Sequence, residues 1–263
     1  LSQDNMKVGL VLSGGGARGI AHLGAIQALE EAGVQFDMVS GTSAGALLGA
    51  LYCYGYSPKE ILQRIQKTNF YGFLRPALNW KGLINIEKAS DEIKKHIPED
   101  NFSALKKPLY VTATQVNKGK AKVFSKGQLI KPLLASSSIP VLFNPVTIRN
   151  KQYVDGGITD NLPIKPLKNK CDKVIAMHCN PIEKDYKVES WRDLMERSLL
   201  IAITINSHRA KNKCDVFIEP PGVADFRVLD IKSAPQIYEV GYDYTRRQIE
   251  EKDILKRFQI VNV

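Results

Sequence analysis

Residues 36–54 read FDMVSGTSAGALLGALYCY, a pattern typical of a strand, a tight turn and a helix. The apolar start predicts a strand over Phe36 to Val39, and the run Ala44 to Tyr54 predicts a helix. Between them, Gly41-Thr42-Ser43-Ala44-Gly45 forms a GxSxG turn, which strains the backbone of its serine and lifts the hydroxyl clear of the sheet. Ser43 is therefore the first candidate nucleophile, and the two glycines, Gly41 and Gly45, support the turn.

A second strand–turn–helix unit precedes this one. Lys7 to Leu12 predict a strand, Gly14-Gly15-Gly16-Ala17-Arg18-Gly19 a turn, and Ile20 to Ala32 a helix. Two consecutive units of this form predict parallel strands joined by right-handed crossovers. Because parallel strands end at the same edge of a sheet, we expect the glycine-rich turn to lie near Ser43.

The rest of the chain alternates between strands and helices in the same way. Further strands are predicted at Pro108 to Val116, Lys120 to Ser125, twice within Val146 to Val154, at Lys173 to His178 and at Cys214 to Ile218. Further helices are predicted at Ser57 to Lys67, Gln128 to Ser136, Ser190 to Lys211 and within Pro235 to Phe258. This alternation predicts an α/β fold, a three-layer α/β/α sandwich with a mainly parallel central sheet. At 263 residues we expect one domain over residues 1–263, with a motif-bearing core at about 7–180 and a helical region at about 190–263.

The composition is that of a globular protein, with 44% hydrophobic and 24% charged residues. No apolar run reaches the roughly 18 to 20 residues that span a bilayer, and Leu1 to Lys7 is too polar for the apolar core of a signal peptide. A leader removed before residue 1 would leave no trace in this sequence. The four cysteines are sparse and irregularly spaced, which favours a reducing compartment. We expect a cytoplasmic protein, with peripheral attachment to a membrane as a variant of that expectation.

The net charge of +10 bears on the partners of the protein. Lysine and arginine cluster at Lys118 to Lys122, Lys165 to Lys173 and Arg209 to Lys213. If these clusters share one face, each basic side chain would contribute about 1 kcal/mol of attraction to an anionic membrane. The sequence shows no interleaving of aromatic and basic residues and no motif of the kind that binds nucleic acid, so no nucleic-acid partner is expected.

The glycine-rich turn has two interpretations. Gly14, Gly16 and Gly19 satisfy the GxGxxG spacing of a dinucleotide-binding fingerprint, but such a unit needs a carboxylate at the end of its second strand. Here Asp37 begins the second strand, and the Ser43 turn occupies its end. The other interpretation is an oxyanion hole built from the amides of Gly14, Gly15 and Gly16, each donor contributing on the order of 3 kcal/mol to the transition state. Arg18 would add positive charge for the oxyanion or for a phosphate.

A nucleophilic serine needs a base, and Asp155 is the candidate. The four histidines, His22, His96, His178 and His208, lie in predicted helices, a charged stretch or a buried strand rather than in a turn that presents a base. Asp155 instead follows a strand directly before Gly156-Gly157, where it can point into a cleft at the end of a sheet. The sequence therefore pairs Ser43 with Asp155.

No metal site is expected, because His178 and Cys179 are neighbours in a predicted strand and point to opposite faces. The predicted helix over Ser190 to Lys211 carries a stripe of residues at helical spacing, Leu194, Ser198, Ile201 and Ile205. Such a stripe predicts a packed face, with His208 at its edge. The aromatic-rich stretch Asn69 to Ile86 either packs irregularly over the core or forms a wall or cover for an acyl chain.

These motifs together resemble the patatin-like phospholipase family, including the bacterial branch similar to the esterase domain of neuropathy target esterase. The resemblance rests on the Gly14 to Gly19 loop, the Gly41 to Gly45 elbow and Asp155-Gly156-Gly157. Ala135-Ser136-Ser137-Ser138-Ile139-Pro140 and Asn161-Leu162-Pro163 are also similar to family blocks, and all five occur in family order.

The resemblance implies a modified α/β-hydrolase fold and a serine–aspartate dyad that needs no metal or diffusible cofactor. Asp155 would take the Ser43 proton, an acyl-enzyme would form, and water would release the fatty acid. The expected activity is hydrolysis of acyl esters of lipids, of the phospholipase A, lysophospholipase or esterase type. Two alternatives are a dinucleotide-binding oxidoreductase and a non-catalytic lipid-binding module at a membrane surface. The oligomeric state, the physiological substrate, the head group and the chain-length preference stay open. The sequence also leaves open an acyltransferase, in which another alcohol replaces water at the acyl-enzyme.

Overall fold

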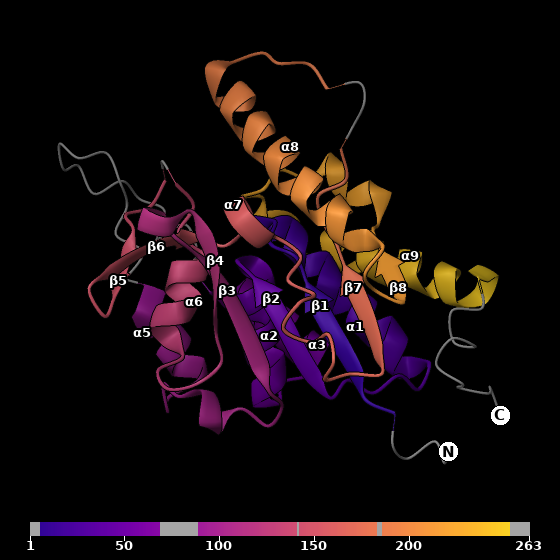
Figure 1. The fold of residues 1–263 in the computed structure, drawn as a ribbon. Helices are drawn as coiled ribbons and strands as arrows, with labels where there is room; N and C mark the ends of the chain where they lie inside the picture. The colour runs from indigo at the N-terminus through magenta and orange to yellow at the C-terminus, as the bar shows by residue number, and fades with distance from the viewer. Residues whose placement is uncertain (1–5, 69–88, 141, 183–185, 253–263) are drawn as a thin grey trace.

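The computed structural model describes residues 6–68, 89–140, 142–182 and 186–252 (Figure 1). Its strands are β1 (Val8–Leu12), β2 (Met38–Thr42), β3 (Leu109–Gln115), β4 (Lys120–Phe124), β5 (Val146–Ile148), β6 (Lys151–Asp155), β7 (Lys173–Met177) and β8 (Val216–Ile218). Its helices are α1 (Ala21–Glu31), α2 (Ala44–Tyr54), α3 (Pro58–Lys67), α5 (Ala89–His96), α6 (Ile130–Ser136), α7 (Gly157–Asp160), α8 (Trp191–Lys211) and α9 (Ala234–Lys252). The stretch Asn69 to Ile86 lies outside the described residues, so its two interpretations stay open.

The strands form one sheet in the order β5-β6-β3-β2-β1-β7-β8, with β4 also paired to β3. The pairs β1–β2, β1–β7, β2–β3 and β7–β8 are parallel, whereas β4, β5 and β6 join by antiparallel pairs. The predicted α/β fold with a mainly parallel central sheet is confirmed. The predicted hairpin between β3 and β4 is also present, with Gly119 in the left-handed conformation that its turn requires.

Strand β3 brings two distant segments together on one of its edges. Parallel β2 pairs with the first half of β3 and ends at Thr42, opposite Thr112. Antiparallel β6 pairs with the second half and ends at Asp155, opposite Ala113. Because β4 pairs with β3 over both halves, β2 and β6 must share the other edge. The two strands therefore meet end to end at neighbouring residues of β3, and the chain that follows each end emerges at the same place.

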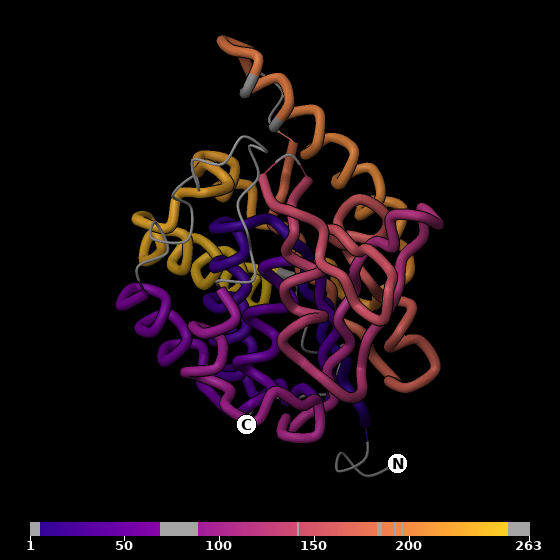
Figure 2. Tube along the Cα trace, turned by 90° about the vertical axis from the view of Figure 1, so that its left-hand side faces the viewer, coloured from indigo at the N-terminus to yellow at the C-terminus, as the bar shows by residue number. Residues whose placement is uncertain are grey.

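Alternate residues of the central strands supply two cores on opposite faces of the sheet. Leu10 and Leu12 of β1 pack into a large core with α1, α2, α3 and α9, whereas Val11 packs on the other face with Leu162 and Leu167. The second face is covered by the segment after α7 and by the C-terminal part of α8, which contributes Ala210. Figure 2 shows these helical layers on either side of the sheet.

The start of the second strand differs from the prediction. Strand β2 begins at Met38, two residues later than Phe36. Phe36 is instead fully buried against Tyr52, and the carboxylate of Asp37 accepts a hydrogen bond from the amide of Val8 at 2.7 Å. An aspartate that binds backbone in this way favours a turn over a strand. Asp37 thus precedes β2, and the end of β2 remains at the Ser43 turn.

The expected packed face of α8 is wrong. Leu194, Ile201 and Ile205 are 53%, 37% and 48% exposed, and Ser198 is exposed as well. The side of α8 that packs on the protein instead carries Thr204 and Ser207, both 0% exposed. Periodicity shows which residues share a face of a helix, but it does not show which face is covered.

No helix in the described part of the chain combines the length and apolar composition needed to cross a bilayer.

Candidate active site

Ser43 occupies a strained turn between β2 and α2. Its φ of 52° and ψ of −126° are unfavourable for a residue with a side chain. The flanking glycines permit the close approach of backbone that holds this turn. A Cβ on Gly41 would lie 2.6 Å from the carbonyl oxygen of Gly45, and a Cβ on Gly45 would overlap the carbonyl oxygen of Leu12. The turn also places the N-terminus of α2, with its partial positive charge, directly after Ser43.

Ser43 and Asp155 form a direct hydrogen bond. The Ser43 hydroxyl donates to Oδ2 of Asp155 at 2.6 Å, and each residue is 6% exposed. The second carboxylate oxygen, Oδ1, accepts a hydrogen bond from the amide of Gly157 at 2.8 Å. The carboxylate is thereby oriented with one oxygen toward the serine, as a proton acceptor must be.

Burial raises the pKa of Asp155 to about 6, although the hydrogen bonds from Ser43 and Gly157 act in the opposite direction. A base with a pKa near the working pH is ionised at pH 7 and still accepts a proton readily. The carboxylate is therefore suited to take a proton from Ser43.

Side chains and backbone from α6 and β3 fix both groups. The amide of Ser43 donates to Oγ of Ser136 at 2.8 Å, and that hydroxyl donates to the carbonyl of Thr112 at 2.6 Å. The amide of Asp155 donates to the carbonyl of Ser138 at 2.8 Å, and its carbonyl accepts from Thr114. The block 135–140 had no predicted role. Its serines, Ser136 and Ser138, bind the backbone amides of Ser43 and Asp155.

The glycine-rich loop lies against Ser43, as its position at the same sheet edge predicted. A Cβ built on Gly14 would lie 2.8 Å from the Cβ of Ser43. The Gly14 amide donates to Oδ1 of Asn161 at 3.0 Å, and the Gly14 carbonyl accepts from Nδ2 of Asn180 at 2.6 Å. Gly14 is thus clamped between two asparagines that follow Asp155 and β7. Its amide is hydrogen-bonded to the side chain of Asn161.

Gly15 and Gly16 are the remaining donors of this loop. Their amides donate to none of the described residues. Gly16 has a φ of 58°, and a side chain at Gly15 would overlap Sγ of Cys179, so neither position accommodates a larger residue. These two adjacent amides belong to the loop that contacts Ser43, and an oxyanion hole is built from backbone amides of this kind.

Arg18 binds the C-terminal part of the chain. Its Nε donates to the carbonyl of Phe226 at 2.6 Å and its Nη2 to the carbonyl of Ala224 at 3.1 Å, with the side chain largely buried. The amide of Ala17 likewise donates to the carbonyl of Val228 at 2.7 Å. These contacts connect the loop after Gly16 to residues 224–228, and no motif in the sequence indicates this connection.

All four histidines make their hydrogen bonds to groups other than Ser43 and Asp155. Buried His22 contacts the carbonyl of Ser13 through Nε2 at 3.0 Å, and burial lowers its pKa to about 4. His96 contacts Arg64 and Glu92. His208 contacts Glu219. These positions agree with the choice of Asp155 over histidine as the partner of Ser43.

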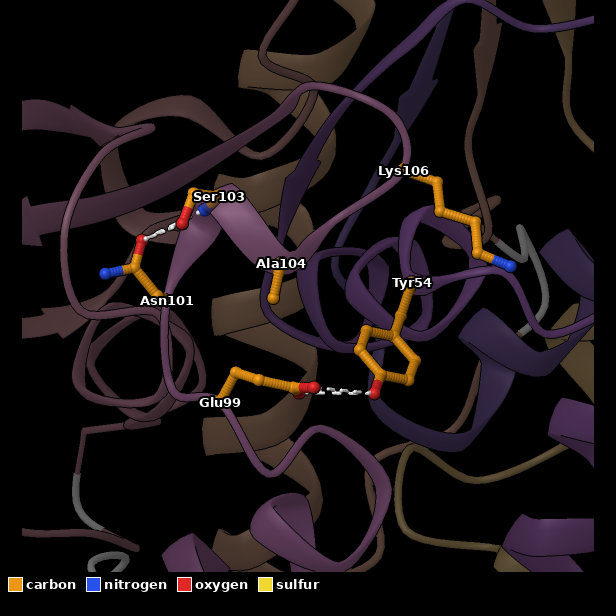
Figure 3. A pocket seen from close by; sticks show the side chains of 6 residues that line it. All are labelled: Tyr54, Glu99, Asn101, Ser103, Ala104 and Lys106. Carbon is orange, nitrogen blue, oxygen red and sulfur yellow. Dashed lines mark hydrogen bonds between the residues drawn. The ribbon is translucent and has the colours of Figure 1, made fainter.

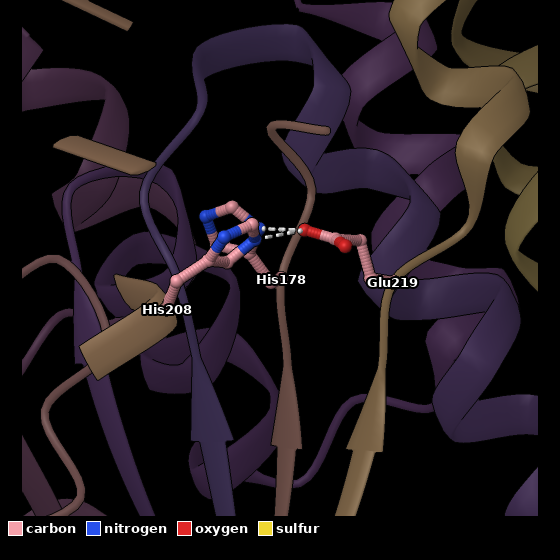
Figure 4. Close-up of side chains that lie close together, drawn as sticks. All are labelled: His178, His208 and Glu219. Atoms are coloured by element: carbon pink, nitrogen blue, oxygen red, sulfur yellow. Dashed lines mark hydrogen bonds and ion pairs between the residues drawn. The ribbon is translucent and has the colours of Figure 1, made fainter. Parts of the chain in front are cut away.

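Within the described residues, one cluster has ligand atoms close enough to hold a metal ion, within 4.8 Å of one another. It consists of His178, His208 and Glu219 (Figure 4). Oε1 of Glu219 lies 2.6 Å from Nδ1 of His178 and 3.2 Å from Nε2 of His208. Ligands on a tetrahedral metal with bonds of 2.0–2.1 Å stand about 3.3 Å apart. His178 and Glu219 are closer than that, so the present arrangement is that of hydrogen-bonded side chains.

A cavity of about 270 Å³ opens beside Ser43. Its walls are mostly apolar and come from α2, α5, α6 and the segment near residue 229; they include Leu47, Ile93, Leu133, Leu134, Phe143 and Leu229. Gly16 and Ser43 also line it, so the expected oxyanion donor and the candidate nucleophile face the same space. An apolar cavity with a few polar groups at the reacting position suits a fatty acyl chain.

A second cavity, of about 500 Å³, lies between Tyr54, Glu99 and Lys106 (Figure 3). Tyr54 ends α2, whereas Ser43 precedes it, so roughly 16 Å of helix separate this cavity from the elbow. The hydroxyl of Tyr54 donates to Glu99, and Ser103 bonds Asn101. We assign this hollow no part in the chemistry of Ser43.

The chain is similar to lysophospholipases of fungi. It is 27% identical over 275 residues to lysophospholipase NTE1 of Saccharomyces cerevisiae and 28% identical over 287 residues to that of Kluyveromyces lactis. The alignments cover 91% and 94% of this chain but only 16% and 20% of those proteins. The chain thus spans less than a quarter of the length of these relatives.

Two solved structures share the fold. VipD from Legionella pneumophila matches with a TM-score of 0.60 at 16% identity, covering 93% of this chain and 67% of VipD. The type III effector ExoU of Pseudomonas aeruginosa matches with a TM-score of 0.52 at 16% identity, covering 97% of this chain and 54% of ExoU. The family model for patatin-like phospholipases matches residues 10–168, which hold the glycine loop, the elbow, Asp155 and Asn161. By this match over more than half its length, the chain belongs to the patatin-like phospholipase family.

Proposed function

We propose that this protein is a serine acyl hydrolase that cleaves fatty acyl esters of phospholipids or lysophospholipids. The observation that carries the proposal is the 2.6 Å hydrogen bond from Ser43 to Asp155, made beside an apolar cavity. The family and the fungal lysophospholipases it resembles support the same class of substrate.

In the first half of the proposed reaction, Oγ of Ser43 attacks the ester carbonyl as its proton passes to Oδ2 of Asp155. The carbonyl oxygen becomes an oxyanion, which the amides of Gly15 and Gly16 stabilise by about 3 kcal/mol each. The tetrahedral intermediate then expels the alcohol, which takes the proton from Asp155. The products of this half are the acyl-enzyme at Ser43 and the glycerol-containing alcohol.

In the second half, water replaces the alcohol. Asp155, again a carboxylate, accepts a proton from the water that attacks the acyl-enzyme. The second tetrahedral intermediate collapses, Ser43 regains its proton from Asp155, and the fatty acid leaves. No step needs a metal or a diffusible cofactor, because Asp155 holds the proton and the loop amides hold the negative charge.

The assignment of each donor follows from its contacts. The amide of Gly14 is hydrogen-bonded to Asn161, so we propose that Gly14 positions the loop. The amides of Gly15 and Gly16 then stabilise the oxyanion. Arg18 holds residues 224–226 through two carbonyls, so we propose that it supports the loop rather than contacting a phosphate.

We also propose that the protein works in a reducing compartment, on the cytoplasmic side of a membrane. All four cysteines are present as thiols. The net charge of +10 favours contact with anionic lipid surfaces.

A comparison of three proteins tests this function. Wild type, Ser43→Ala and Asp155→Asn are incubated with a fluorophosphonate probe and with mixed phospholipids and lysophospholipids, and the products are identified by mass spectrometry. We expect labelling and fatty acid release by the wild type, with neither from Ser43→Ala. Labelling that survives Ser43→Ala would refute Ser43 as the nucleophile, and saturable binding of a dinucleotide would favour the oxidoreductase alternative.

A further inference from the structure

Helix α8 presents its apolar residues to the outside. Trp191, Leu194, Met195, Ile201 and Ile205 are 65%, 53%, 44%, 37% and 48% exposed. With Ser198 and Ala202, also exposed, they recur at spacings of three and four residues and so form one face of the helix. We call these seven residues the α8 face. A soluble helix normally has the reverse arrangement, with its apolar face toward the protein.

The C-terminal half of α8 is attached to the protein by polar contacts. The hydroxyl of Thr204 donates to the carbonyl of Asn180 at 3.0 Å, and Ser207 accepts from Nδ2 of Asn161 at 3.3 Å. Asn206 donates to the carbonyl of Ile158. The N-terminal half, which begins at Trp191, projects beyond the rest of the protein in both views (Figures 1 and 2). The C-terminal half of α8 is therefore hydrogen-bonded to the protein, and the α8 face points away from it.

The α8 face lies at the sheet edge that carries Ser43. The C-terminal half of α8 binds Asn161 and Asn180, the same two asparagines that hold Gly14. Other exposed apolar side chains also follow strands at this edge: Val116 comes after β3, Ile158 after β6 and Ile182 after β7. Leu229, 41% exposed, belongs to the wall of the cavity beside Ser43. Exposed apolar side chains thus lie at the same end of the sheet as Ser43, and Leu229 connects them to the cavity.

Basic and aromatic residues border this surface. Arg209 follows Ile205 by one helical turn and is exposed, and Arg197 packs its guanidinium over the ring of Tyr186 at 4.6 Å. Trp191 and Tyr186 are aromatic residues of the kind that lie at the boundary between water and lipid. An apolar face flanked by basic residues is the pattern of a helix that lies in the surface of an anionic bilayer.

We propose that the α8 face docks on the surface of an anionic lipid bilayer and so places the opening of the Ser43 cavity at that surface. The inference rests on the lipid-directed function proposed above and names the surface that performs the attachment. In this arrangement α8 lies in the plane of the head groups, with Leu194 and Ile201 toward the acyl chains. A substrate would then reach the cavity along apolar surface, without crossing water.

Binding is tested on the Ser43→Ala protein, so that it does not depend on hydrolysis. Its sedimentation is measured with vesicles of phosphatidylcholine alone and with vesicles that also contain 30% phosphatidylglycerol. In the same background, the triple variant Leu194→Ser, Met195→Ser, Ile201→Ser tests the α8 face. Tyr54→Ser, which removes a large side chain at the opposite end of α2, is the matched control. Ala202→Leu extends the apolar face. Circular dichroism checks that each variant is folded.

We expect the parent protein to bind the phosphatidylglycerol vesicles more tightly than vesicles of phosphatidylcholine alone. Relative to the parent, the triple variant should lose at least tenfold in partition coefficient. Tyr54→Ser should bind like the parent, and Ala202→Leu should bind more tightly than the parent. Equal binding by the triple variant and the control would overturn the proposal. So would a dimer of the parent protein, seen by sedimentation equilibrium, that the triple variant dissociates without a change in vesicle binding. Hydrolysis of a water-soluble short-chain ester, with Ser43 restored, should be unaffected by the triple change, which separates failure of docking from failure of the proposed catalysis.

Discussion

Gly14 donates its amide hydrogen to Oδ1 of Asn161 at 3.0 Å, across 147 positions of sequence. The same oxygen lies near Asp155, since a Cβ on Gly157 would stand 3.1 Å from Oδ1 of Asn161 and equally far from Oδ1 of Asp155. Asn161 therefore touches both the loop and the turn that presents Asp155. It is a residue that positions the two halves of the site.

Replacing Asn161 by alanine should lower kcat by about tenfold to hundredfold with little change in KM, because a displaced loop misaligns the donors for the transition state. Steady-state kinetics on a soluble ester measure kcat and KM separately. Asn161→Asp keeps an acceptor for Gly14 but adds a negative charge near Asp155, so the pH midpoint of kcat/KM should move upward. A structural role alone would leave that midpoint in place.

The activity of the wild type should rise with pH, with a midpoint at about pH 6, and level off at about pH 7. The pKa of Asp155 is raised to about 6 by burial, and only the ionised carboxylate accepts the Ser43 proton. Asp155→Asn should retain the fold and lose about 10⁴ in kcat, on the scale seen when a triad aspartate is replaced by asparagine. Near-normal turnover in the folded variant would rule out Asp155 as the base.

The same shift has a consequence for stability. The pKa of Asp155 is higher in the folded protein, about 6, than its usual 3.8, so the folded state binds more protons between these values. The contribution of Asp155 to the free energy of unfolding is fully present below pH 4, and it is lost as the pH rises through 6. At pH 7 the buried carboxylate is thus destabilising, by at most about 3 kcal/mol. Asp155→Asn should raise the melting temperature at pH 7 and have a smaller effect at pH 4, as differential scanning calorimetry can measure.

Local patterns predicted the parts of the site, and the topology of the sheet explains what they could not predict. The elbow and the Gly14 loop follow strands with clear apolar runs, so their common edge could be derived from βα units alone. The approach of β6 to the same edge of β3 depends on pairing across 42 residues, from Ala113 to Asp155, which no local pattern records. Local sequence likewise does not record the contacts of Arg18 with residues 224–226. Nor does it record which side of α8 is covered, because both depend on tertiary structure.

Ser136 and Ser137 offer a matched pair of substitutions. Oγ of Ser136 accepts from the Ser43 amide and donates to Thr112, whereas the buried hydroxyl of Ser137 has no hydrogen-bond partner among the described residues. Ser136→Ala should destabilise the protein by about 1–3 kcal/mol, because it leaves a buried amide and a buried carbonyl unsatisfied. Ser137→Ala should be close to neutral. Urea denaturation compares the two, and equal effects would show that Ser136 does not hold the elbow.

The cavity beside Ser43 should set the chain length of the preferred acyl group. Leu47 lines this cavity from α2, one helical turn after the elbow, and is only partly buried. Leu47→Trp would fill part of the space without touching the hydrogen bonds of Ser43 or Asp155. We expect kcat/KM for a sixteen-carbon ester to fall by at least tenfold, while that for a four-carbon ester changes less than twofold. Because a short acyl chain needs only the space next to Ser43, equal losses for both esters would mean that the acyl chain lies elsewhere.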